Sequence, residues 1–266
     1  MKNINNSLKN VNILNRKTWE NRLSVLTFVN QNNLQKAEIE IFEKYKQKIS
    51  GKSVLDIGCG TGRTTRFLAT HTSNIIGIDY SERMISAASK LNPNIDYRVC
   101  DVRDLNSLSQ HQFDFILYSF NGLDYLDHMD RIRALKNIHK VLKNDGVFVF
   151  SSHNINNFNH SLSPRLKFEL NIYKQFKNIV KFCIEVFYYL RFHKKKIVTD
   201  DYSIFNDDGN FFSLLTYYIS KEKAADQLKN CGFDILEIFD QYGNNLSQIF
   251  NDEYSNWIYY VAKKNN

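Results

Sequence analysis

The stretch from Val54 to Gly62, V-L-D-I-G-C-G-T-G, decides the fold class of this chain. Its first four residues form an apolar run of strand length, and the glycines mark a turn into the helical pattern that starts at Arg63. Glycines at such a turn let a ligand approach the backbone closely, and the amides that begin a helix attract an anionic group. The stretch therefore predicts a strand, a ligand-binding turn and a helix.

The same alternation of short apolar runs and helical patterns continues along the chain, and this alternation indicates a parallel sheet in an α/β fold. The runs that predict strands are 53–57, 75–79, 96–100, 113–119, 147–152, 233–240 and 256–262. Between them, helices are predicted over 63–70, 81–91, 129–142 and 221–230. Ser220 suits the N-cap of the last helix and Gly232 suits its end.

About sixty-five residues without this rhythm follow the fifth strand. They contain an aromatic-rich helical run over 166–192 and a β-like pair around 202–205 and 211–219. We therefore expect four segments, which are an N-terminal helical cap (1–50), a core (51–153), an inserted lid (154–219) and a part that completes the sheet (220–266).

Composition and charge narrow the class of protein. A chain of 266 residues with 43% hydrophobic residues suits one folding unit. Neither a signal peptide nor a membrane-spanning run is present, and the four dispersed cysteines lack metal-site spacing, so we expect a cytoplasmic protein with reduced thiols. The segment Ser161–Thr199 holds nine basic residues and two acidic ones, a net charge of +7 that equals the net charge of the chain.

Two acids lie where strands of the predicted sheet end. Asp79 ends the second strand, 17 residues after Gly62, and Asp101 follows the third. A carboxylate at the end of the second strand can accept hydrogen bonds from both hydroxyls of a ribose, and an acid beside an apolar sheet is unfavourable unless something pairs with it. The nicotinamide fingerprint is G-x-G-x-x-G, whereas here the third glycine comes one residue early, which disfavours a dehydrogenase.

The motifs D-I-G-C-G-T-G-R, G-I-D-Y-S-E-R-M, C-D-V-R-D-L, F-D-F-I-L-Y-S and V-L-K-N-D-G-V-F-V-F, in this order over residues 52–152, resemble those of class I S-adenosylmethionine (SAM)-dependent methyltransferases. The resemblance implies a Rossmann-like seven-stranded sheet, mostly parallel with an antiparallel last strand. It also implies SAM as the methyl donor and S-adenosylhomocysteine (SAH) as the product.

Carried over to this chain, the resemblance sets the methionine moiety against Asp56 and the glycine turn and the ribose on Asp79. It sets the adenine near Tyr80 and Met84, with Asp101 and Val102 at its edge, and Ser119 beside the sulfonium. Trp19, on the apolar stripe of an N-terminal helix, is the candidate lid contact. The candidate cofactor-binding residues are Trp19, Asp56, Gly58, Cys59, Gly60, Gly62, Asp79, Tyr80, Met84, Asp101, Val102 and Ser119.

Methyl transfer requires an in-line approach of nucleophile and methyl group, and a hydroxyl acceptor benefits from a general base. The candidates near the ends of the fourth and fifth strands are Asn121, Asp124, Tyr125, His128, His153 and Asn154, and His153 is the first choice because it directly follows the fifth strand. The acids before residue 131 suit a helix N-terminus capped by Asp127 or Asp130, so no metal site is expected there.

The insertion resembles the substrate lids of bacterial methyltransferases that act on sugars or cell-surface precursors. We expect O-methylation of a phosphorylated or nucleotide-activated sugar, or another precursor of a capsule or surface polysaccharide, because basic residues concentrate anionic ligands. Phe168, Tyr173 and Phe176 are candidates to cover a base or sugar. The alternatives are an RNA methyltransferase and a non-catalytic protein whose run Leu166–Lys196 lies on anionic lipid or a partner. DNA is not an expected partner, the insertion is a candidate dimer face, and nitrogen acceptors stay open.

Overall fold

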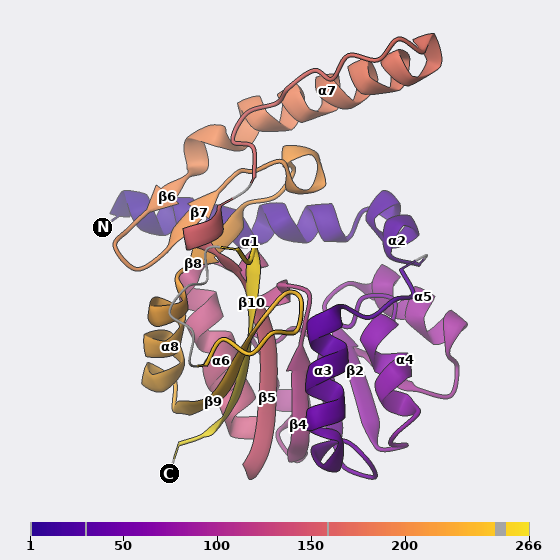
Figure 1. The fold of residues 1–266 in the computed structure, drawn as a ribbon, viewed down its shortest axis with the longest axis vertical. Helices are drawn as coiled ribbons and strands as arrows, with labels where there is room; N and C mark the ends of the chain where they lie inside the picture. Colours follow the sequence, from indigo (N-terminus) through magenta and orange to yellow (C-terminus); the bar gives the residue numbers. More distant parts are fainter. Residues whose placement is uncertain (1, 30, 159, 248–253, 266) are drawn as a thin grey trace.

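The computed structural model describes residues 2–29, 31–158, 160–247 and 254–265. Its centre is a sheet in the order β3 (Asp96–Val99), β2 (Ile75–Asp79), β1 (Val54–Ile57), β4 (Phe113–Tyr118) and β5 (Leu142–Asn154), with all five strands parallel. The edge of β5 that faces away from β4 pairs with β10 (Trp257–Lys264). Strand β10 in turn pairs with β9 (Phe233–Asp240), and both of these pairings are antiparallel (Figure 1). The predicted Rossmann-like α/β fold is confirmed.

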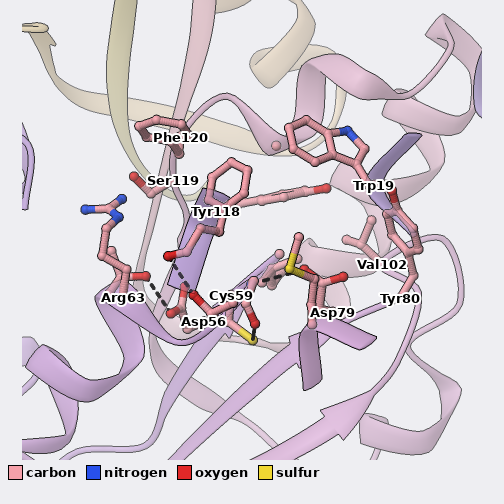
Figure 2. A pocket seen from close by; sticks show the side chains of 18 of the residues that line it. Trp19, Asp56, Cys59, Arg63, Asp79, Tyr80, Val102, Tyr118, Ser119 and Phe120 are labelled. Atoms are coloured by element: carbon pink, nitrogen blue, oxygen red, sulfur yellow. Dashed lines mark hydrogen bonds between the residues drawn. The ribbon is translucent and has the colours of Figure 1, made fainter. Parts of the chain in front are cut away.

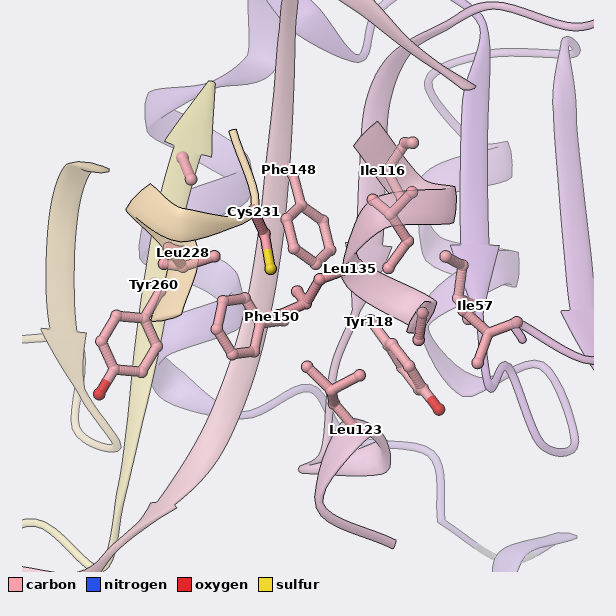
Figure 3. Packing of buried hydrophobic residues seen from close by; sticks show 14 of the residues in the cluster. Ile57, Ile116, Tyr118, Leu123, Leu135, Phe148, Phe150, Leu228, Cys231 and Tyr260 are labelled. Atoms are coloured by element: carbon pink, nitrogen blue, oxygen red, sulfur yellow. The ribbon is translucent and has the colours of Figure 1, made fainter. Parts of the chain in front are cut away.

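Helices cover the two faces of the sheet because successive residues of a strand point to opposite faces. In β4, Ile116 and Tyr118 face one core cluster, which includes residues of α6 (His128–Val141) and α8 (Lys221–Asn230). Phe115 and Leu117 face the other cluster, with residues of α3 (Lys36–Lys44) and α4 (Arg63–Ala69). Figure 3 shows the first cluster, where aromatic residues of β5 pack among side chains of α6 and α8. Helix α5 (Glu82–Leu91) follows β2 and also belongs to the core.

Most predicted element boundaries agree with the structure to within two residues, and two predicted caps are confirmed. The Asp127 side chain accepts from Asp130 N at the start of α6, and the Ser220 side chain accepts from Lys223 N at the start of α8. Strand β5 begins at Leu142, five residues earlier than expected, because Leu142 pairs with Phe113 across a register shift.

The insertion adds strands to the central sheet. It contains α7 (Ile172–Phe192), β6 (Ile197–Val198), β7 (Ser203–Phe205) and β8 (Thr216–Ile219). Strand β8 runs parallel to β5, with Tyr218 opposite His153, on the edge that β4 leaves open after Tyr118. The predicted β-like pair is therefore present as β7 and β8, while the two-residue strand β6 was not predicted. Helix α7 starts six residues later than predicted, where Asn171 caps it.

The N-terminal segment forms α1 (Lys2–Trp19) and α2 (Arg22–Val29) before α3. Helix α1 crosses above the carboxyl ends of the central strands (Figure 1). Its buried Asn15 donates to the carbonyls of Tyr125 and Leu215 and accepts from Leu215 N, so α1 ties the loop after β4 to the insertion. Among the described helices, none has the length and apolar character that crossing a membrane requires.

Candidate active site

A cleft opens where β1, β2 and β4 end (Figure 2). Concave sites of this kind, lined by aromatic residues and a few polar groups, are where small molecules bind. The structure brings ten of the twelve candidate cofactor-binding residues to its lining, namely Trp19, Asp56, Gly58, Cys59, Gly60, Asp79, Tyr80, Met84, Val102 and Ser119. Gly62 and Asp101 are not part of the lining.

Two glycines of the turn have different roles. Gly60 leaves space for a ligand, and Gly62 leaves space for a packed side chain. Gly60 has φ +54°, and a Cβ built there would meet no atom within 4 Å, so its backbone is open to a ligand. Gly62 has φ +86°, and a Cβ there would lie 2.2 Å from Tyr97 Oη. The third glycine of the motif is therefore required by the neighbouring ring of Tyr97 rather than by the cleft.

Asp79 presents a buried carboxylate at the end of β2. Its Oδ2 accepts from Gly60 N at 3.1 Å and its Oδ1 accepts from Ser81 N at 2.8 Å. Burial raises the pKa of Asp79 to about 6; the two backbone bonds oppose this rise, and the nearby charge of Asp101 adds to it. Each oxygen keeps acceptor capacity for a ligand.

Asp56 is the second acid of the cleft, and it holds the start of α4. Its Oδ2 accepts from Thr64 Oγ1 at 2.7 Å and from Thr65 Oγ1 at 2.6 Å. Burial raises the pKa of Asp56 to about 6 against these two hydroxyl bonds. Since α4 begins at the glycine turn, this acid also fixes the turn on which a ligand would rest.

An aromatic wall closes the cleft on the side of the N-terminal helices. The Trp19 ring lies 5.0 Å from Tyr125 and 5.4 Å from Phe28, and Phe28 lies 6.1 Å from Phe120. Trp19 Nε1 is buried and has no hydrogen-bond partner among the described residues. A buried indole N–H normally finds an acceptor, so this orphan donor in the lining fits a polar ligand that supplies one.

Arg63 is the cation of the described lining, and the sequence analysis gave it no role. Its guanidinium binds both carboxylate oxygens of Glu38, at 2.5 and 2.7 Å, and Glu38 is buried on α3. Ser119 Oγ donates to the same carboxylate. The position of Arg63 directly after the glycine turn could have identified it as a residue of the cleft. The burial of Glu38 could not have been predicted, because the local sequence of α3 does not distinguish a buried acid from an exposed one.

Asp101 is engaged by its own loop. Its two oxygens accept from Arg103 Nη2 at 2.6 Å and from Arg103 Nε at 2.9 Å, and Arg103 also reaches Asp130 at 2.8 Å. Burial acts to raise the pKa of Asp101, but the bonds from Arg103 hold it below its usual value. Its neighbour Val102 is the residue of this pair that lines the cleft.

A carboxylate–imidazole pair lies behind the wall of the cleft. His153 Nδ1 is 2.7 Å from Asp124 Oδ2, and His153 Nε2 is 3.2 Å from Asn121 Nδ2. Asp124 is fully buried and also accepts from Arg131 Nη1 at 2.5 Å and from Ser152 Oγ at 2.6 Å. With Asp124 Oδ2 accepting a hydrogen bond from Nδ1–H, the lone pair of the imidazole lies on Nε2, which is the basic site.

The loop after β4 connects this pair to the cleft. Asn121, Asp124 and His153 do not line the cleft themselves, but Phe120, Gly122 and Tyr125 do. Phe120 and Asn121 both have φ +56°, which is unusual for residues with a side chain. Residues in such sparsely populated conformations cluster at functional sites, so the strain at this turn supports a role of the turn in the site.

The remaining acids and histidines of this region have other partners. His128 Nδ1 lies 2.9 Å from Tyr217 Oη, and its ring stacks on Tyr202 at 4.3 Å. Asp127 caps α6 and Asp130 pairs with Arg103. A different trio, His160, Asp207 and Asp208, has its potential ligand atoms within 4.8 Å of one another. The sequence analysis missed this trio because almost fifty residues separate His160 from the two acids.

Comparisons with known proteins agree with this architecture. Residues 54–146 match the methyltransferase domain family. The chain is 28% identical to an uncharacterized protein of Methanocaldococcus jannaschii, over 85% of this chain and 81% of that protein. It is 34% identical to the ubiquinone biosynthesis O-methyltransferase of Coxiella burnetii, over 41% of this chain and 46% of that enzyme, so the match spans less than half of the enzyme's length.

Among solved structures, a SAM-dependent methyltransferase from Clostridium acetobutylicum is similar with a TM-score of 0.60 and 19% identity. The match covers 87% of this chain and 92% of that one. At this identity the similarity concerns the fold.

Proposed function

We propose that this chain is a class I SAM-dependent methyltransferase and that it transfers the methyl group to a hydroxyl of a small anionic acceptor; the methyltransferase-domain match and the shared fold support this. The observation that carries the proposal is the buried Asp124–His153 pair directly behind the cleft. A general base can remove the proton of a hydroxyl nucleophile, and this help matters less for an amine, which is a stronger nucleophile.

The lining of the cleft suits each part of the donor. Asp79 has acceptor capacity for the two ribose hydroxyls, and Tyr80 and Met84 lie where the adenine would be flanked. Arg63, which lines the cleft and pairs with Glu38, would bind the methionine carboxylate through the N–H groups that Glu38 does not use, and Trp19 Nε1 would offer its unused donor. Bound there, SAM supplies a sulfonium-activated methyl group.

His153 would act as the general base. The acceptor hydroxyl loses its proton to Nε2 as its oxygen attacks the methyl group, and Asp124 stabilises the imidazolium that forms. Arg131 orients the Asp124 carboxylate by donating a hydrogen bond to its other oxygen. Asn121 donates to Nε2 in the structure, so it would orient the ring before the acceptor arrives.

The proposed acceptor carries phosphate, as a nucleotide-activated sugar or another precursor of a surface polysaccharide does. Nine basic residues against two acidic ones in Ser161–Thr199 support this choice, because a positive field raises the local concentration of anions. The insertion approaches the base through β8, where the ring of Tyr218 lies 5.2 Å from His153. The aromatic residues expected to cover the acceptor, Phe168, Tyr173 and Phe176, are exposed on and before α7 and do not line the cleft.

The experiment that tests the base is a comparison of His153→Ala with His128→Ala. We expect His153→Ala to lower the rate of SAH formation by about 10² to 10⁴ with a hydroxyl acceptor, as removal of a general base does. Its SAH affinity should stay unchanged because His153 does not line the cleft. His128→Ala is the matched control, since this imidazole bonds Tyr217 instead. Near-normal turnover of His153→Ala would refute the assignment.

The acceptor class is tested by salt and by neutral analogues. With a phosphorylated sugar acceptor, we expect kcat/KM to fall steeply between low and moderate ionic strength, because salt screens electrostatic steering. Equal rates on the phosphorylated acceptor and its dephosphorylated analogue, or a salt-independent kcat/KM, would contradict an anionic acceptor.

A further inference from the structure

Helix α7 carries a continuous apolar stripe that faces solvent. We define the outer stripe as the positions that recur every three or four residues along one side of the helix, Ile172, Phe176, Ile179, Cys183, Phe187 and Leu190. All six are exposed, and the exposed fractions of the five residues other than Cys183 run from 44% at Ile179 to 88% at Ile172. Single exposed apolar residues are ordinary, but a row of them marks an interaction surface.

The outer stripe takes no part in the fold of the described chain. Helix α7 buries Glu185 and Phe192, and Tyr189 packs against Phe212 in the turn Gly209–Phe212. In Figure 1 the N-terminal part of α7 extends away from the sheet. The donor cleft has no lining residue from α7, so the stripe has a role separate from donor binding.

Basic residues occupy the side of α7 opposite the stripe. Lys174, Lys177 and Lys181 recur at three- and four-residue spacing, and all three are exposed. Arg191 and Lys194–Lys196 continue the positive charge at the end of the helix. A helix with Ile, Phe and Leu on one face and Lys on the other is typical of helices that lie in the interface of an anionic membrane.

We propose that α7 docks the enzyme on an anionic membrane surface, with the outer stripe at the acyl chains and the lysines of the polar face attracted by the negative potential of the lipid headgroups. Charge complementarity favours lipid over a second copy of this chain. Two copies meeting through α7 would bring together two segments that each carry +7, whereas anionic lipid supplies the opposite charge.

Vesicle flotation of the full chain tests this docking. We expect binding to vesicles that contain phosphatidylglycerol, little binding to vesicles of phosphatidylcholine alone, and release at high salt. Ile179→Glu together with Phe187→Glu should abolish binding. Lys174→Gln together with Lys177→Gln should weaken it by about 25-fold, because each basic residue near an anionic surface strengthens binding by about fivefold.

The matched control is Met129→Glu, which changes a side chain that is 65% exposed on α6 in the same way. It should bind vesicles like the wild type. SAH affinity and Tm of the α7 variants should equal those of the wild type because their side chains are exposed and outside the cleft. This readout separates a failure of docking from a failure of the proposed function, since neither measurement needs the acceptor.

Three results would overturn the proposal. The first is no binding to anionic vesicles, and the second is equal binding to both kinds of vesicle. The third is a wild-type dimer in sedimentation velocity that the Ile179→Glu, Phe187→Glu variant converts to a monomer, without vesicle binding by either protein. That result would assign the outer stripe to an interface between copies.

Discussion

Replacing Asp79 by Ala tests the donor site at its most informative residue. In the structure its two oxygens already accept from Gly60 N and Ser81 N, so a bound ribose would add two further hydrogen bonds to the same carboxylate. Hydrogen bonds to a charged group contribute about 1.5 to 3 kcal/mol each, or about 3 to 6 kcal/mol together. We therefore expect Kd for SAH to rise by about 10² to 10⁴.

Isothermal titration calorimetry with SAH measures this change without knowledge of the acceptor. Asp79→Asn keeps an acceptor for the turn and separates the loss of charge from the loss of turn geometry. Asp96→Ala is the control, because this exposed acid at the start of β3 bonds Arg98 outside the cleft. If a folded Asp79→Ala protein bound SAH within about threefold of the wild type, the hydrogen-bond reasoning would be refuted.

Three further predictions follow from buried groups. Burial raises the pKa of Asp79 to about 6, and a ribose needs the ionised acid, so SAH binding should weaken as pH falls through that value. Calorimetry at several pH values measures this change. The same pH profile in Asp79→Asn would assign the effect to another acid, such as Asp56. Gly62→Ala should reduce unfolding free energy in urea by about 1 to 3 kcal/mol because its Cβ meets Tyr97 Oη, and Tyr97→Phe should restore part of the loss, whereas no rescue would contradict the clash. Arg131→Leu leaves a buried carboxylate without its cation, so urea unfolding should show a loss of about 3 to 5 kcal/mol, and a loss below about 1 would contradict this.

The sheet could be predicted from the sequence because its strands are short apolar runs bounded by turn signals. Strand β2, Ile75–Asp79, has the bounds that its pattern indicated. Strand β6 could not be predicted, since two residues carry no periodicity. The start of β5 at Leu142 was also missed because its pairing with Phe113 depends on a register shift between distant segments.

The candidate site divides in the same way between local and distant information. The glycine turn and Asp79 belong to compact motifs, and both reach the cleft. Glu38 lies on α3 and Arg131 lies on α6, and both side chains are buried. The hydrophobic pattern of these two helices does not indicate that either polar residue is buried. Glu38 meets Arg63, 25 residues away, and Arg131 reaches Gln227, 96 residues away. Pairings of this kind arise only when the helices pack on the sheet.

The insertion shows a further limit of sequence periodicity. The run over 166–192 predicted a helix, and α7 is present, but the pattern did not tell which side packs against the protein. The apolar side points to solvent, and the contacts with the protein come from residues such as Glu185 and Phe192. The expectation that aromatic residues of the insertion cover the acceptor came from the resemblance to substrate lids, which carries no information about the direction in which Phe168, Tyr173 and Phe176 point.

The pairing of β8 with β5 determines how this enzyme could be re-engineered. Tyr218 of β8 and Trp257 of β10 flank His153 on its two sides, so the insertion supplies one backbone neighbour of the strand that carries His153. A deletion of the whole insertion would expose an unpaired strand edge, which recruits other chains and promotes aggregation. Exchange of acceptor modules between related enzymes should therefore keep β7 and β8 and replace only the stretch that contains α7. Chimeras with that junction should stay monodisperse, while chimeras cut at Asn154 should precipitate.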